Sequence, residues 1–214
     1  KLDVDESGTN VIKGQNNKIA VSELGVFEED ALDLWSNSTS ADGREVSRGG
    51  ASSLIDPNNR LAVTDLACSS YPCDLTTDNN LLKTTNAKDS GIITNAVLGL
   101  GDDATESLRY ALINFARGRV WNEKTGVYDL EPHMGDMLHT EPVVVTYDKN
   151  YQADSFDSDV SPGQVVFAAT NEGYIHAFNF TTGKELFAYV PSVFVKYINL
   201  QYVTTAVSIF AYRI

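Results

Sequence analysis

Cys68 and Cys73 are the two cysteines of the chain, and Ser-Ser-Tyr-Pro separates them. This short segment with Pro72 makes a tight loop whose ends can meet in disulfide geometry, and an exported, oxidising setting favours such a bridge. Half of a metal site is the alternative, but the chain has no second cysteine pair and no histidine close by. We therefore expect a disulfide that stiffens the loop and has no catalytic role.

The segment 148–163 is rich in carboxylates. It carries Asp148, Asp154, Asp157 and Asp159, and Ca²⁺ binds several oxygen ligands from flexible loops of this kind. Calcium held by Asp154, Asp157 and Asp159 is therefore one interpretation. Only Asp157 and Asp159 alternate, however, and no glutamate follows as a bidentate ligand, so a solvated loop is favoured.

The N-terminus offers a second candidate for calcium. Residues 3–8, Asp-Val-Asp-Glu-Ser-Gly, place oxygen side chains at alternate positions before a glycine, as in the first half of an EF-hand loop. The twelfth position is Gly14, where such a loop needs its bidentate glutamate. A frayed terminus is the favoured interpretation.

Histidines are few, and none is placed for catalysis. His133, Asp136 and His139 lie close in sequence, but in a strand Asp136 and His139 would face opposite sides, so hydrogen-bonded structural roles are favoured over a metal site. His176 alternates with Phe178 and is expected to be packed. No nucleophile elbow, zinc-protease motif or phosphate loop occurs. We expect no catalytic residue and no enzyme activity.

Composition limits the partners of the chain. Its 214 residues carry 16 Lys and Arg against 29 Asp and Glu, a net charge of -13, which repels nucleic-acid phosphates. No apolar run approaches the length that spans a bilayer, so no transmembrane segment is expected. The chain begins at Lys1 with no signal sequence, which predicts a mature start or an internal fragment.

Helices and strands must hold these candidate residues in place. The sequence of the first 130 residues predicts few helices or strands. This region is a loop-rich, mixed part in which 19–27 could form a strand or a short edge. Leu108, Leu112 and Phe115 fall on one helical face. Asp103 as the N-cap, with Glu106 three residues on, and Gly118 as the stop predict an amphipathic helix over about 104–117.

The pattern changes to β-strands after Pro142. Four apolar runs are separated by turn residues, with a glycine between the second and third and another between the third and fourth; the runs are 143–147, 165–170, 174–180 and 185–190. Four consecutive antiparallel strands are typical of one propeller blade. We expect a mainly β chain with one amphipathic helix, a first blade over 131–191 and a tail of uncertain nature over 192–214.

These segments resemble the PilC/PilY adhesins of type IV pili. Residues 166–191 resemble the first blade of that family, and 134–145, Met-Gly-Asp-Met-Leu-His-Thr-Glu-Pro-Val-Val-Val, are similar to its Gly-Asp-x-x-His-Ser-x-Pro-Val-Val strand. The helix end at 114–118, Asn-Phe-Ala-Arg-Gly, and the Arg-Gly-Gly-Ala of 48–51 match in the same order. The chain lacks the von Willebrand A-like region of many members, and 192–214 do not resemble a second blade.

The resemblance implies a secreted bacterial protein at the pilus tip or outer membrane, with a partial, quinoprotein-like propeller. Its partners would be pilin subunits or minor pilins and a host or surface receptor, and its roles pilus biogenesis, attachment and twitching motility. Some members hold calcium in a later part of the propeller. One alternative is a pyrroloquinoline-quinone dehydrogenase, because 177–187 resemble its Ala-x-Asp-x-x-x-Gly-x-x-x-Trp motif with Asn179 and Phe187 substituted. Another is a non-catalytic outer-membrane scaffold.

A lone blade would leave two apolar faces open, and soluble monomers rarely expose such patches. The helix face of Leu108, Leu112 and Phe115 is one expected cover. The tail over 203–212, added as a strand to an open edge, is another. If neither is enough, we expect a second copy of the chain to cover the blade, and hence self-association.

Overall fold

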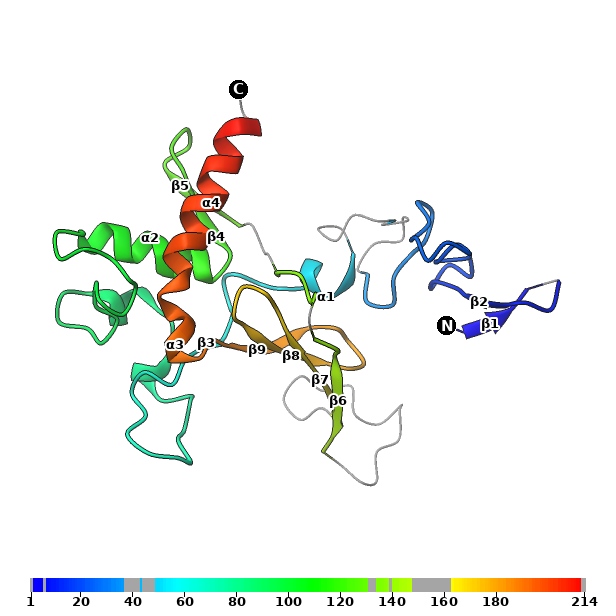
Figure 1. The fold of residues 1–214 in the computed structure, drawn as a ribbon, viewed down its shortest axis with the longest axis horizontal. Helices are drawn as coiled ribbons and strands as arrows, with labels where there is room; N and C mark the ends of the chain where they lie inside the picture. Colours follow the sequence, from blue (N-terminus) through cyan, green and yellow to red (C-terminus); the bar gives the residue numbers. More distant parts are fainter. Residues whose placement is uncertain are drawn as a thin grey trace.

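The computed structural model describes residues 2–5, 7–36, 43, 49–130, 134–138, 140–147 and 163–212, with side chains described as far as Thr204 in the last helix. The described chain is a mixture of sheets and short helices (Figure 1). The strands are β1 (Leu2–Val4), β2 (Asn10–Ile12), β3 (Ala62–Val63), β4 (Arg119–Asn122), β5 (Val127–Leu130), β6 (Val143–Thr146), β7 (Gln164–Ala169), β8 (Ile175–Asn179) and β9 (Glu185–Tyr189). The helices are α1 (Gly50–Ser53), α2 (Glu106–Ala116), α3 (Ser192–Val195) and α4 (Tyr197–Tyr212), with 3-10 turns η1 (Asp78–Asn80) and η2 (Thr84–Ala87).

The four strands predicted after Pro142 form one antiparallel meander. Neighbours pair in sequence order, β6 with β7, β7 with β8 and β8 with β9. Gly173 and Gly183 adopt φ of 82° and 71° in the two hairpin turns, as predicted from the sequence. A fifth strand was not predicted: β3 adds to the outer side of β9 and runs parallel to it.

The two faces of this sheet differ in what covers them. Val166, Ala168 and Phe178 point to one face, where Ile55 joins them in a buried cluster with Trp35 and Met134 packed alongside. On the opposite face the rings of Phe167 and Phe187 meet edge to face at 6.3 Å, and Val143 and Ile175 are exposed. Earlier segments of the chain therefore cover one apolar face, while the other keeps exposed apolar side chains among the described residues.

Helix α2 forms where the sequence predicts it, but it begins at a different cap. Thr105 is the N-cap, and its side chain accepts a hydrogen bond from Leu108 N, so the assignment of Asp103 to this role was wrong. The positive φ of Gly118, 83°, follows the C-cap Arg117 as expected. Leu112 and Phe115 are buried in the larger core, with Leu108 packed against it, which confirms the predicted apolar face.

The tail is helical, so the prediction that it adds a strand to the sheet was wrong, as was the expectation of a single helix. Val195 in α3 and Ile198 in α4 are buried in the same core as α2. The rings of Phe115 and Tyr202 meet edge to face at 5.5 Å. Helix α4 thus packs on α2 (Figure 1) instead of closing a sheet edge.

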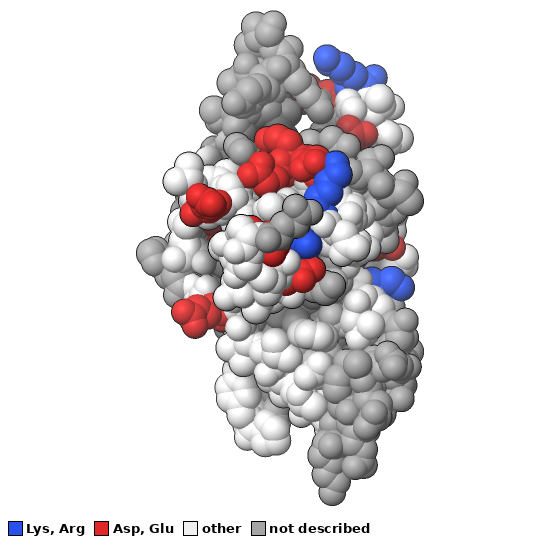
Figure 2. Space-filling model, turned by 90° about the vertical axis from the view of Figure 1, so that its right-hand side faces the viewer, with Lys and Arg blue, Asp and Glu red and all other residues white. Residues whose placement is uncertain are grey.

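The N-terminus is more ordered than predicted. β1 and β2 pair as an antiparallel hairpin, with Leu2 opposite Ile12, which replaces the expected frayed end. The strand predicted over 19–27 is present only as isolated bridges, Lys13 with Ile19 and Val21 with Phe27. This end of the molecule lies at one side of Figure 1, and acidic side chains gather on the face seen from that side (Figure 2).

Within the described part of the chain, no helix is both long and apolar enough to cross a membrane.

The cap of α2 gives a direct test of the helix boundary. Thr105→Ala removes the acceptor for Leu108 N and should lower the free energy of unfolding by about 1 kcal/mol. Asp103→Ala is the matched control and should change it by less than about 0.5 kcal/mol. Urea denaturation of both variants measures the difference. A larger loss for Asp103→Ala would restore the sequence-based cap and contradict the structure.

Candidate functional site

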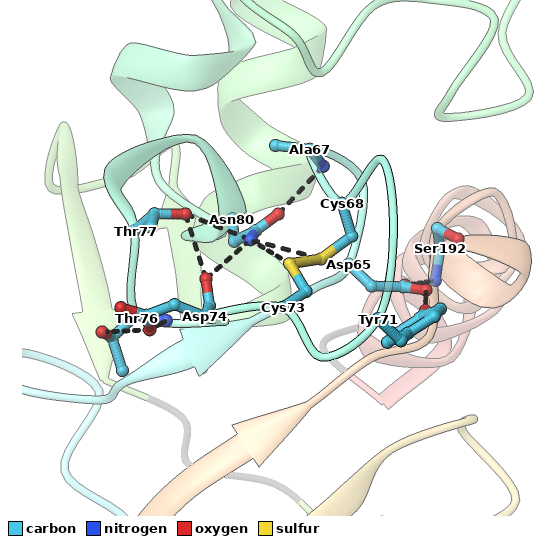
Figure 3. Close-up of a disulfide and its surroundings, with 10 residues drawn as sticks. All are labelled: Asp65, Ala67, Cys68, Tyr71, Cys73, Asp74, Thr76, Thr77, Asn80 and Ser192. Carbon is cyan, nitrogen blue, oxygen red and sulfur yellow. Dashed lines mark hydrogen bonds between the residues drawn. A yellow bond between two sulfur atoms is a disulfide. The ribbon is translucent and has the colours of Figure 1, made fainter.

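The loop closed by the two cysteines is the first candidate (Figure 3). Cys68 and Cys73 form a disulfide with an S–S distance of 1.94 Å and a Cα–Cα distance of 5.8 Å. The Tyr71–Pro72 peptide bond within it is cis. The loop follows β3 directly, so its position depends on the strand that joins the sheet beside β9.

Asn80 fixes this loop from the inside (Figure 3). Its buried side-chain oxygen accepts a hydrogen bond from Ala67 N at 2.9 Å. Its amide nitrogen donates to Asp74 O and Thr77 Oγ1, both at 3.1 Å, and lies 3.6 Å from each sulfur of the disulfide. A buried amide with partners for both its oxygen and its nitrogen holds a loop in one arrangement. Sequence reasoning missed Asn80, because it ends the polar run 76–80, and such a run is typical of an exposed connection.

Asp65 connects the loop to the C-terminal helices. One carboxylate oxygen accepts a hydrogen bond from Tyr71 Oη at 2.6 Å, and the other accepts one from Ser192 N at 2.6 Å, at the start of α3. Burial would raise the pKa of Asp65, but these hydrogen bonds outweigh it and the pKa lies below its ordinary value. The pKa of Tyr71 is raised because its hydroxyl donates to this carboxylate. Burial, with Asp65 nearby, raises the pKa of Tyr189 to about 12.

A buried ion pair is the second candidate. Arg60 Nε and Glu185 Oε2 are 2.8 Å apart, and Arg60 Nη2 donates to Glu185 Oε1 at 3.1 Å. His176 Nδ1 is hydrogen-bonded to the same Oε1 at 2.7 Å. The exposed fractions of the Arg60, Glu185 and His176 side chains are 1%, 4% and 0%. The pair therefore links the segment before β3 to two neighbouring strands, β8 and β9.

Aromatic rings and a helix end enclose these charges. Arg60 lies over the ring of Tyr174, 5.5 Å from its centroid, and donates from Nη1 to Ala116 O at the end of α2. His176 stacks between Tyr174 and Phe178, with ring centroids 5.7 and 5.6 Å away, so it is packed as predicted. Burial acts to raise the pKa of Glu185, but the hydrogen bond from His176 and the charge of Arg60 prevail and lower it.

The buried pair of Arg60 and Glu185 has a structural role. Both Glu185 oxygens are occupied by Arg60 and His176, and the three side chains are closed to solvent. A carboxylate so held has a fixed geometry, with both oxygens already hydrogen-bonded within the protein. Sequence reasoning did not predict the pair, because Arg60 and Glu185 are 125 residues apart. Each of them also lies beside an ordinary apolar run.

The structure describes only some of the residues that the sequence offers as metal ligands. Asp148, Asp154, Asp157, Asp159, His133 and His139 lie outside the part that the structure describes. Asp136 is exposed, and its backbone oxygen accepts from Asn171 N. Asp5 accepts hydrogen bonds from Ser7 and Thr9 within the first hairpin. Over the described ranges, no group of three His, Cys, Asp or Glu side chains is close enough to hold a metal ion.

Comparison with protein-family models, curated proteins and solved structures finds no match for this chain.

Removing the charge of Glu185 should leave Arg60 buried without its ionic partner and so lower the free energy of unfolding. We expect Glu185→Gln to lower the free energy of unfolding by about 3 kcal/mol or more, as for other broken buried pairs. Glu23→Gln, at an exposed position, is the control and should cost less than about 0.5 kcal/mol.

The same pair of variants separates a charge effect from a packing effect by its pH dependence. Because the pKa of Glu185 is lowered on folding, its contribution is complete above the unfolded pKa of about 4.3 and is lost as the pH falls through the lower folded value. Denaturation midpoints between pH 7 and pH 2 should fall more steeply in the wild type than in Glu185→Gln. Parallel pH curves, or equal losses for the two substitutions at pH 7, would contradict a stabilising pair.

Proposed function

We propose that this chain is part of a bacterial surface adhesin of the PilC/PilY kind, located at the tip of a type IV pilus or at the outer membrane. It would act in pilus assembly and in attachment to a host or surface receptor, through contacts with pilins and without chemistry on a substrate. Calcium at Asp154, Asp157 and Asp159 is the alternative within this proposal to the solvated loop that the sequence favours for these residues.

The observation that carries the proposal is the β6–β9 meander. Its strands coincide with the segment that resembles a first propeller blade, and α2 with its Asn114-Phe-Ala-Arg-Gly118 end precedes it in the order of the family. Residues of the resembling turn have clear structural roles: Asn179 Oδ1 accepts from Thr181 N and Thr182 N, and Gly183 lies where a Cβ would meet Trp35. A first propeller blade is an interpretation that these features support.

The arrangement of charges favours a binding role over catalysis. The carboxylate–histidine pair of Glu185 and His176 resembles part of a catalytic group in type, but Arg60 occupies the carboxylate and all three side chains are buried. The dehydrogenase alternative rests on the degenerate motif at 177–187, in which asparagine and phenylalanine replace the aspartate and tryptophan.

Genetic removal tests the proposal. Deletion of the gene from the source bacterium should reduce surface pili and attachment together, because an adhesin that also promotes assembly is needed for both. Restoring the intact gene should return both, and an intact gene carrying Glu23→Gln should do so equally well. Pili are counted by electron microscopy of sheared fractions, and attachment by adhering cells.

Unchanged piliation and attachment after deletion would contradict the adhesin. Titration of the purified protein with pyrroloquinoline quinone then separates the alternatives: saturable binding in the micromolar range would favour the dehydrogenase. The adhesin proposal expects no such saturation, since it assigns no cofactor of this type to the chain.

A further inference from the structure

Tyr71 lies exposed at the surface, and packing in the core does not account for its position. The exposed fraction of the residue is 73%. Its loop neighbours Ser69, Ser70 and Pro72 are exposed as well. An exposed large ring at the tip of a closed loop contributes little to the core, and such a ring is a common anchor in protein interfaces.

Three constraints hold this ring in place before any partner arrives. The disulfide of Cys68 and Cys73 closes the loop on both sides of it, and Asn80 fixes the loop from below. The Tyr71 hydroxyl donates to Asp65, which is itself held by Ser192 N. A side chain ordered in advance loses little conformational entropy on binding, which favours affinity.

The charges around the ring indicate the chemistry of its partner. The Asp65 carboxylate accepts a hydrogen bond from the Tyr71 hydroxyl at 2.6 Å, which places a negative charge at the hydroxyl end of the ring (Figure 3). The net charge of the whole chain is -13, so its long-range field also attracts cations and repels anions.

We propose that the loop closed by Cys68 and Cys73 is a contact surface on which Tyr71 receives an arginine or lysine side chain of a partner protein. The cation would lie over the exposed ring as a cation–π pair, with the Asp65 carboxylate as its negative neighbour. Serine and tyrosine on a constrained loop form the composition that protein-binding loops use for adaptable hydrogen bonds and rigid contact area. This inference rests on the proposed adhesive function and names one surface that would serve it.

The experiment uses the purified full chain and two labelled peptides of equal length. One is acetyl-(Gly-Ser-Arg)4-amide, and the other carries citrulline, a neutral isostere, in place of each arginine. Fluorescence anisotropy at moderate salt should show binding of the arginine peptide and much weaker binding of the citrulline peptide. Tyr71→Ala should weaken the arginine peptide about three- to thirtyfold, the range of one cation–π contact.

Matched variants make the result specific to this loop. Tyr147→Ala removes a tyrosine with a similar exposed fraction, 64%, at the other end of the sheet, and should leave the affinity unchanged. Tyr71→Phe keeps the ring but loses the bond to Asp65, so it should bind between the wild type and Tyr71→Ala. Cys68→Ser with Cys73→Ser should weaken binding while the ring remains.

Equal binding by Tyr71→Ala and the wild type would overturn the inference, as would a loss of equal size in Tyr147→Ala. Tyr71-dependent binding to an oligosaccharide array, with no preference for arginine over citrulline, would assign the loop to carbohydrate instead. This test is independent of the gene deletion. Reduced piliation without Tyr71-dependent peptide binding would support the adhesin but not this contact surface. Tyr71-dependent peptide binding with unchanged piliation would support the contact surface but not the adhesin.

Discussion

The buried pair of Arg60 and Glu185 is the constraint on which the rest of the structure depends. Arg60 precedes β3, and its guanidinium reaches β9 through Glu185 and the end of α2 through Ala116 O. If two opposite charges that are buried away from solvent separate, they lose their mutual attraction and each is left buried without a partner, so the pair fixes the relative positions of these elements. The backbone then completes the arrangement: Ala188 N donates to Leu61 O and Val190 N to Val63 O. The β6–β9 meander is therefore joined to the earlier part of the chain and is not a free-standing blade.

The position of β3 also determines where the disulfide loop lies on the surface. Because β3 is held beside β9, the disulfide loop that follows it lies next to the start of α3, where Asp65 reaches Ser192 N. The loop, the sheet edge and the C-terminal helices thus form one continuous framework, with Tyr71 at its outer end. This framework holds the exposed ring of Tyr71 in one place, and the proposed contact surface depends on it.

Local patterns predicted the local structure. Alternating apolar runs with Gly173 and Gly183 between them were enough to predict four strands, and the helical spacing of Leu112 and Phe115 was enough for α2. Choices between near neighbours were harder: Thr105 and Asp103 are both good caps, and only the backbone decides between them. The nature of the tail stayed open in the sequence, with an added strand as one possibility, because an apolar run without charges is ambiguous between the two periods. Packing of Ile198 and Tyr202 against α2 selects the helix. The Arg60–Glu185 pair and the role of Asn80 depend on contacts between distant segments, which no single-sequence pattern contains.

Native-state hydrogen exchange is the measurement that tests the joined framework most directly. The amides of Ala188 and Val190, which bond to the β3 segment, should exchange with the same opening free energy as the amides of Leu112 and Ile113 in α2, because both belong to one cooperative unit. That shared value should fall equally at both places in Glu185→Gln. If the β9 amides instead open well below those of α2, or if the substitution lowers only one of the two groups, the meander and the preceding part are separate units and the account is wrong.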